Sequence, residues 1–245
     1  KEQAEKVGTT IHNDLVTNVD FTSVPFIAQT DGGLSFESQT IIISTGAQAR
    51  WLEISSEEKF KGYGISACAT CDGFFFKDQE VAVIGGGNSA VEESLYLTNF
   101  ASKVTLIHRR DSLRAEKILQ DRLFKHPKIE VLWNKTIKEF QGSKDPVGLE
   151  SLLLQDTKDE SLSNLKVNGA FIAIGHDPAT SLFKDKVHMD KENYIITKPD
   201  STETSIPGIY AAGDVKDKKY RQAVTAAGMG CMAALEAEKF IAENK

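Results

Sequence analysis

The sequence has little of what marks secreted, membrane or nucleic-acid-binding proteins. Its 245 residues include three cysteines, too few for the disulfide scaffold of a small secreted domain. No apolar run approaches the roughly 20 residues that span a bilayer, and the first ten residues lack the apolar core of a signal peptide. A formal net charge of −6 disfavours nucleic acid as a partner. Together these features predict a cytoplasmic enzyme with no nucleic-acid or membrane partner.

What is present is ordinary for a globular protein: 40% hydrophobic and 26% charged residues. The length suits one large domain or two modest ones. The chain starts at Lys1 without an initiator methionine, in the middle of a helix-then-strand pattern. We therefore expect a fragment or a partly represented protein.

The middle of the chain alternates strands and helices. "QEVAVIG", "SKVTLIHRR", "KIEVLW" and "GAFIAIG" predict buried strands, and two helices are expected among them. The second helix is expected over "DSLRAEKILQDRLFKH", with Asp111 or Ser112 as its N-cap. Residues 148–154 and 165–167 suggest a small antiparallel insertion. This succession predicts an α/β fold with a parallel sheet and right-handed crossovers.

The two ends of the chain are expected to form one domain. The opening predicts a helix end, strands at 11–15 and 25–30, and the buried strand "QTIIISTGA". The tail predicts two strands in "NYIITKPDSTETSIPGIYAAGDV" and then a long helix. Because neither piece is large enough for its own core, we infer a discontinuous domain. It comprises residues 1–49 and 178–245, and residues 50–177 are inserted into it.

"VAVIGGGNSA" places a Gly-x-Gly-x-x-Ala pattern directly between a strand and a helix. The first glycine permits a tight turn, the second lets the backbone approach a pyrophosphate, and the alanine keeps the helix near the strand. The alternative is a glycine-rich turn with no ligand. The candidate nucleotide-binding residues here are Gly85, Gly87, Asn88, Ser89 and Ala90.

The end of the next strand indicates which nucleotide binds. An NAD site usually has an acidic residue there for the ribose 2′-hydroxyl, whereas this sequence has His108, Arg109 and Arg110, followed by Arg114. Guanidinium groups bind a 2′-phosphate bidentately, so the pattern predicts NADPH. The alternative is a solvated basic strand end. Asp111 is expected to cap a helix without touching the cofactor.

"CATCDG" holds Cys68 and Cys71, two of the three cysteines. Zinc would need two more ligands, but Cys231 lies far away, where we expect a small buried hydrophobe in an amphipathic helix. The five histidines show no ligand spacing. A static disulfide is disfavoured in the cytoplasm, so the pair favours a redox couple. Asp72 is a candidate acid/base, or alternatively a turn or helix cap.

Hydride transfer from a nicotinamide to a disulfide needs a flavin as intermediary. "GIYAAGDV" ends a strand with Gly213 and Asp214, whose carboxylate could accept hydrogen bonds from ribityl hydroxyls. The helix that begins near Arg221, Gln222 and Ala223 would direct its positive end at an anionic reduced flavin. The tail therefore predicts a flavin site.

Over residues 1 to about 240 the chain resembles the bacterial low-molecular-weight thioredoxin reductases. The likeness is carried by "ACATCDG", "VAVIGGGNSAVEE", "LIHRRD", "RAEKIL", "FIAIGH", "SIPGIYAAGDV" and "YRQAVTAAGMGCMAA". The resemblance implies two Rossmann-like dinucleotide-binding domains, with the NADPH domain inserted into the FAD domain. It also implies a homodimer that reduces thioredoxin.

The resemblance implies a role for each matching residue. Cys68 and Cys71 would form the redox disulfide, with Cys71 nearer the flavin and Asp72 as acid/base. The NADPH 2′-phosphate would be held by Arg109, Arg110 and Arg114, with His108 beside them. FAD would be contacted by Asp214, Arg221, Gln222 and Ala223.

The opening of the chain departs from the family, because members begin with a second GxGxxG motif for FAD and none precedes Gln39. The FAD domain is therefore expected to be incomplete, and a flavin-free NADPH-binding fragment is an alternative. A flavoprotein that reduces a peroxiredoxin is another. Ferredoxin–NADP reductase relatives lack the cysteine pair and are excluded.

The layout predicts a motion. The disulfide and the nicotinamide site belong to one domain, yet each must meet a flavin held by the other domain. We therefore expect the inserted domain to rotate about linkers near residues 46–52 and 174–179.

Overall fold

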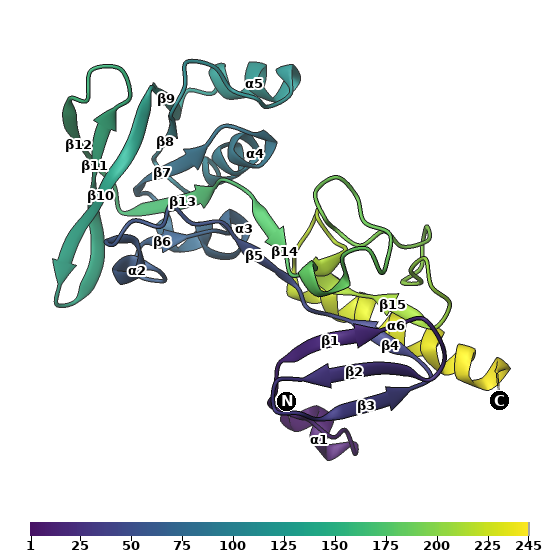
Figure 1. Cartoon of the computed structure of the whole chain (residues 1–245). Helices are drawn as coiled ribbons and strands as arrows, with labels where there is room; N and C mark the ends of the chain where they lie inside the picture. Colours follow the sequence, from purple (N-terminus) through teal and green to yellow (C-terminus); the bar gives the residue numbers. More distant parts are fainter. Residues whose placement is uncertain (245) are drawn as a thin grey trace. The chain divides into compact units, whose positions relative to one another are not determined.

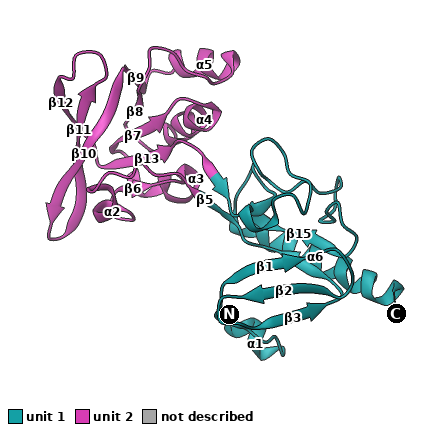
Figure 2. Cartoon of the chain, viewed as in Figure 1, with its two compact units in different colours: residues 1–48, 177–245 teal, residues 49–176 magenta. Residues whose placement is uncertain are grey.

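The computed structural model describes residues 1–244, which divide into two compact units (Figure 2). Unit 1 comprises Lys1–Gln48 and Asp177–Lys245, and unit 2 comprises Ala49–His176. The sequence-based divisions lie after residues 49 and 177. The chain passes between the units twice, through the paired strands β5 (Ala47–Ala49) and β14 (His176–Pro178). No helix among residues 1–244 is long and apolar enough to cross a bilayer.

Unit 2 contains a five-stranded parallel sheet and a three-stranded antiparallel sheet (Figure 1). The parallel sheet has the order β6-β13-β7-β8-β9, and the antiparallel one the order β10-β11-β12. Its strands are β6 (Ile65–Ser66), β7 (Glu80–Gly85), β8 (Lys103–His108), β9 (Ile129–Trp133), β10 (Lys135–Lys144), β11 (Val147–Asp156), β12 (Leu162–Lys166) and β13 (Gly169–Ala173). Its helices are α2 (Glu57–Phe60), α3 (Ala69–Asp72), α4 (Asn88–Leu97), α5 (Lys117–Phe124) and the 3-10 turn η1 (Gly73–Phe76).

The parallel sheet is buried on both faces, as its apolar strands require. In β7, Val81 and Val83 join the core that contains α4, whereas Ala82 and Ile84 join the core formed with the antiparallel sheet. Alternate side chains of one strand therefore serve two cores. This packing fixes the carboxyl end of β7, where the glycine loop begins.

Two expectations for unit 2 need correction. The antiparallel insertion has three strands, because the polar-looking strand β10 pairs with β11 along nearly its whole length. The helix expected from residue 111 begins only at Lys117, with Glu116 as N-cap, so neither Asp111 nor Ser112 caps it. The preceding segment cannot be helical because Leu113 and Ala115 alternate into the core, and the Arg114 amide donates to the Gly86 carbonyl.

Unit 1 is built from a three-stranded antiparallel sheet, a two-stranded parallel sheet and a long helix (Figure 1). Its elements are α1 (Glu2–Lys6), β1 (Val16–Asp20), β2 (Phe26–Thr30), β3 (Ser35–Ser38), β4 (Ile41–Ile43), η2 (Ser181–Phe183), β15 (Ile209–Ala211), η3 (Gly213–Val215) and α6 (Ala223–Glu243). β15 pairs in parallel with β4, so the two ends of the chain do share one core, as expected.

Two strand predictions in unit 1 were wrong. The first strand lies at Val16–Asp20 rather than at 11–15, because Asp14 there accepts hydrogen bonds from the amides of Leu15 and Gly32 and ends the loop. Of the two strands expected in the tail, only β15 forms. The region around Ile195 makes an isolated bridge to Met189 instead.

Candidate functional site

The CATC motif forms a disulfide between Cys68 and Cys71, with 5.3 Å between their Cα atoms. Cys68 is the N-cap of the short helix α3. The next residue, Ala69, is 1% exposed and packs in the core that also contains Ala90 and Leu97. Burial of Ala69 thereby fixes the disulfide against helix α4, the helix that follows the glycine loop.

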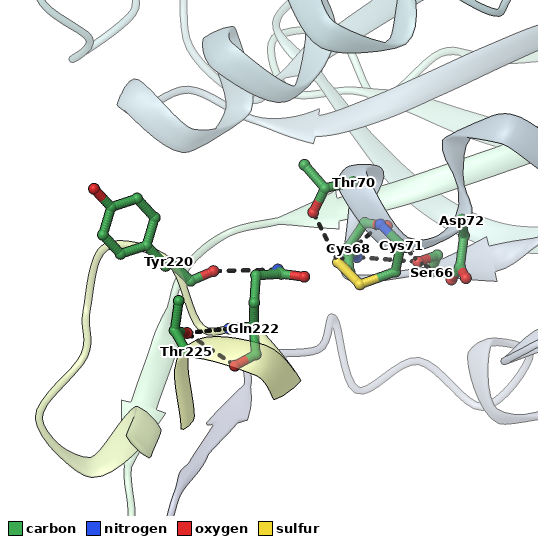
Figure 3. Close-up of a disulfide and its surroundings, with 8 residues drawn as sticks. All are labelled: Ser66, Cys68, Thr70, Cys71, Asp72, Tyr220, Gln222 and Thr225. Atoms are coloured by element: carbon green, nitrogen blue, oxygen red, sulfur yellow. Dashed lines mark hydrogen bonds between the residues drawn. A yellow bond between two sulfur atoms is a disulfide. The ribbon is translucent and has the colours of Figure 1, made fainter. Parts of the chain in front are cut away.

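The two sulfur atoms have different surroundings (Figure 3). Cys68 Sγ accepts a hydrogen bond from the Cys71 amide at 3.2 Å and lies 3.3 Å from the Thr70 hydroxyl oxygen. Cys68 is half-buried, whereas Cys71 is exposed. Because hydrogen bonds to sulfur favour a thiolate, these contacts predict that Cys68 is the attacking thiol once the disulfide is reduced.

Ser66 links Cys68 to Asp72. Its hydroxyl donates to Asp72 Oδ2 at 2.6 Å and accepts from the Cys68 amide at 3.0 Å. In Figure 3 the Asp72 carboxylate lies against Ser66 rather than against the sulfur atoms, and it makes no side-chain cap bond to η1. The acid/base role of Asp72 stays a prediction. Sequence reasoning missed Ser66, since a lone serine two residues before a cysteine carries no motif.

The glycine loop lies between β7 and α4. A Cβ on Gly85 would come within 2.4 Å of the Ala173 carbonyl oxygen and 2.6 Å of the Ala90 Cβ, so strand and helix pack here with no room for a side chain. A Cβ on Gly87 would meet nothing within 4 Å. The backbone of Gly87 therefore faces open space, and Asn88 and Ser89 are exposed beside it in the first turn of α4.

The three predicted phosphate-binding arginines lie close to this loop in the fold. Arg109 and Arg110 follow β8, and Arg114 donates its amide to the Gly86 carbonyl at 2.7 Å. All three residues are exposed. Among the described residues, no carboxylate lies within salt-bridge distance of their guanidinium groups. Three cations without partners are thus available to an anion beside the loop.

His108 is placed differently from the arginines. Its ring is 7% exposed and lies under the loop, with Nδ1 2.8 Å from the Gly85 carbonyl oxygen. A Cβ on Gly86 would be only 2.2 Å from the ring, and Trp133 packs edge-on against it. Burial lowers the pKa of His108 below its usual 6.5, and the charges of Arg110 and Arg114 lower it further. The imidazole is therefore neutral at pH 7.

This burial predicts that unit 2 loses stability in acid. Because the pKa of His108 lies below 6.5 in the folded state, the unfolded chain binds the proton first as pH falls. The stabilisation is complete above pH 6.5 and is lost as pH falls toward the folded-state pKa, with a slope of at most about 1.4 kcal/mol per pH unit. Urea unfolding followed by tryptophan fluorescence measures it, since Trp51 and Trp133 both belong to unit 2.

The variant His108→Gln should flatten this pH dependence, while the same replacement at exposed His188 of unit 1 should leave it unchanged. Equal slopes for the wild type and His108→Gln would refute the assignment.

The predicted flavin-contacting residues lie together in unit 1. Gly213 follows β15 with φ at +76°, a conformation that favours glycine. Burial raises the pKa of the neighbouring Asp214 carboxyl, as does the charge of Asp217, while Arg221 opposes the rise. Helix α6 begins at Ala223, as expected, with Gln222 as N-cap in a capping box with Thr225 (Figure 3).

Asp217 organises the turn before α6 and was missed by sequence reasoning. Its carboxylate accepts hydrogen bonds from the amides of Lys219, Tyr220 and Arg221 at 2.9 to 3.1 Å. These contacts hold Arg221 in the left-handed region, with φ at +48°. The signal that could have revealed it is an aspartate two to four residues before the amides of a tight turn.

Cys231 is exposed, so the prediction of a buried cysteine was wrong. Within α6, only Ala233 and Ala237 are buried, and the face that carries Cys231 points away from that contact. The apolar composition of α6 predicts a larger buried surface than Ala233 and Ala237 provide.

The comparisons with known proteins agree with one another. Residues 1–230 match the family described as pyridine nucleotide-disulphide oxidoreductase. The thioredoxin reductase of Rickettsia felis is 59% identical over 239 residues, which cover 98% of this chain and 77% of that protein. Crystal structures of thioredoxin reductases from Streptococcus pyogenes and Lactococcus lactis (FR conformation) share 41% and 42% identity. Each covers 99% of this chain and 78% of its own, with TM-scores of 0.92 and 0.65.

Proposed function

The chain belongs to the pyridine nucleotide-disulphide oxidoreductases and, among them, to the thioredoxin reductases; on that premise we propose that it passes electrons from NADPH through FAD to the Cys68–Cys71 disulfide and on to thioredoxin. Family membership implies a flavin and a pyridine nucleotide. The observation that carries the proposal is the disulfide in unit 2, fixed against the helix that leaves the glycine loop.

The donor is NADPH because of the charges beside the loop. The open face of Gly87 can receive a pyrophosphate, with free amides at the start of α4. A 2′-phosphate would then be held by Arg109, Arg110 and Arg114, which are exposed and make no ion pair among the described residues. NADH lacks the 2′-phosphate that these cations would bind.

The flavin would be held by unit 1. At Gly213 the lack of a side chain would let the backbone approach the flavin. Asp214 offers acceptors for ribityl hydroxyls, and the α6 N-terminus at Gln222 and Ala223 offers amides to an anion. When bound, the flavin supplies the two-electron carrier between nicotinamide and disulfide. The partly buried carboxyl of Asp214, whose pKa is raised, fits a hydrogen-bonding role toward hydroxyl groups.

The disulfide chemistry follows from the geometry of the two sulfurs. Two electrons and two protons convert the Cys68–Cys71 bond into two thiols. The Cys68 thiolate, stabilised by the Cys71 amide and Thr70, attacks the thioredoxin disulfide and forms a mixed disulfide, releasing one thioredoxin thiolate. Cys71 then attacks Cys68, which restores the internal disulfide and releases the second thioredoxin thiolate.

We expect two phenylalanines next to the disulfide to contact the protein substrate. Phe74 and Phe75 are 67% and 72% exposed, and aromatic side chains at interface centres each contribute strongly to binding. Replacing both by serine should raise KM for thioredoxin about 10-fold or more, with turnover of a small aromatic disulfide unchanged. Tyr63→Ser, at an aromatic of unit 2 that is 61% exposed, is the control. Parallel losses with both substrates would contradict the prediction.

The proposed function is tested with full-length protein. The absorbance spectrum should show bound flavin, and NADPH oxidation should require thioredoxin. The thioredoxin reduced in this way should in turn reduce insulin, which gives the coupled readout. A protein that serves a peroxiredoxin directly would instead turn over with peroxiredoxin alone. Colourless protein that binds NADPH would support a flavin-free binding module.

Three further expectations stay proposals. The protein is expected to act in the cytoplasm, whose reducing conditions suit a dithiol couple, and as a homodimer, which sedimentation measures. Rotation about β5 and β14 is expected during turnover. It is supported by two relatives of nearly equal identity to this chain that superpose on it to very different extents.

A further inference from the structure

The segment that carries the arginines is fastened to the glycine loop at three places. His108 Nδ1 lies 2.8 Å from the Gly85 carbonyl oxygen. The Arg114 amide donates to the Gly86 carbonyl at 2.7 Å. The Glu116 amide donates to Asn88 Oδ1, also at 2.8 Å. Gly85, Gly86 and Asn88 of the loop thus each bind one residue at the arginine-bearing segment, namely His108, Arg114 and Glu116.

These links determine where the arginines can be. Residues 109–116 have no helix or strand of their own. Leu113 and Ala115 are buried on either side of the exposed Arg114. A segment without internal backbone hydrogen bonds keeps its place only through such external contacts. The Gln120 side chain also donates to the Ala115 carbonyl, and the Asn134 amide donates to the Arg110 carbonyl. Freeing the end at Glu116 is therefore expected to loosen this segment in part.

Asn88 makes the link through an exposed side chain. Its Oδ1 accepts from the Glu116 amide, and its Nδ2 lies 3.5 Å from Glu116 Oε1. Asn88 stands at the start of α4, and Glu116 is the N-cap of α5. The side chain thus joins the first turns of two helices, and its acceptor oxygen already has a donor within the protein.

We propose that Asn88 is a positioning residue that couples the two phosphate sites, which rests on NADPH being the donor. By holding residues 109–116 against the loop, Asn88 aligns the arginines with a nucleotide whose 5′-phosphate lies on the loop. Its loss should therefore weaken recognition of the 2′-phosphate selectively. A direct ligand of the pyrophosphate would instead affect every adenine nucleotide.

Calorimetric titration with adenosine 2′,5′-bisphosphate and with 5′-AMP separates these roles without any turnover. In Asn88→Ala we expect affinity for the bisphosphate to fall about fivefold, the loss of one net hydrogen bond, while affinity for 5′-AMP changes less than twofold. Asn88→Asp keeps an acceptor for the Glu116 amide. At high ionic strength, which screens the added carboxylate from both ligands and from Glu116, its ratio of the two affinities should return to within about twofold of wild type.

Asn99→Ala, at the other end of α4 where the side chain bonds only locally to the Tyr96 carbonyl, should retain the wild-type ratio. Equal losses for both nucleotides in Asn88→Ala, or no loss for either, would overturn the coupling. A wild-type protein that binds the two nucleotides equally would overturn the assignment of NADPH itself, and the coupling with it. Thermal unfolding confirms that each variant is folded.

Discussion

Cys68→Ser and Cys71→Ser should each reduce thioredoxin-dependent NADPH oxidation by at least about 1,000-fold, because a single thiol cannot accept and pass on two electrons. Reduction of the bound flavin by NADPH should survive in both variants, since neither sulfur belongs to the nucleotide site. Stopped-flow absorbance of the flavin measures the first step, and coupled insulin reduction measures the whole reaction. Cys231→Ser, which changes the exposed cysteine of unit 1, is the matched control.

The two variants should differ from each other in a trapping experiment. A single-cysteine thioredoxin activated with 2-nitro-5-thiobenzoate releases one equivalent of that thiolate when a protein thiol displaces it and forms a mixed disulfide. Cys71→Ser retains Cys68, whose sulfur keeps the backbone amide at position 71 and Thr70 as partners, so it should react faster than Cys68→Ser. Equal rates, or the reverse order, would contradict Cys68 as the attacking thiol.

The sequence predicts those parts of the fold that repeat a general pattern. Strands β7, β8, β9 and β13 are apolar runs bounded by turn residues, and each formed where it was expected. The glycine loop was recognised because its spacing reflects sterics that the structure shows at Gly85, where no Cβ fits. At these places the local sequence pattern and the tertiary packing favour the same structure, so the pattern alone is enough to predict it.

Prediction failed where a tertiary contact outweighed a local preference. The helix start at Asp111 is sound by capping rules, but Leu113 and Ala115 gain more from burial than from a helical turn. Ser66 and Asp217 act through hydrogen bonds whose geometry exists only in the folded chain. Cys231 was misplaced because composition alone does not show how much of α6 has a partner.

The arginine segment offers the second large effect. A double variant, Arg109→Gln with Arg110→Gln, should lower kcat/KM for NADPH by about 100- to 10,000-fold, since each of the two lost charge-assisted hydrogen bonds contributes about 1.5 to 3 kcal/mol. The value for NADH should change less than about twofold, because NADH has no 2′-phosphate to lose. Arg114→Gln alone should show a smaller loss with the same selectivity.

Flavin reduction measured with each nucleotide checks this, because it isolates the donor site from the disulfide. Arg122→Gln removes an exposed charge from the last turn of α5 and controls for the general electrostatic attraction of an anionic ligand. The selective loss should shrink as ionic strength rises, since partly exposed charges are screened. If NADH were affected as strongly as NADPH, the arginines would serve the shared pyrophosphate. The site would then have no group that selects NADPH, because the backbone amides of the glycine loop cannot distinguish the two nucleotides.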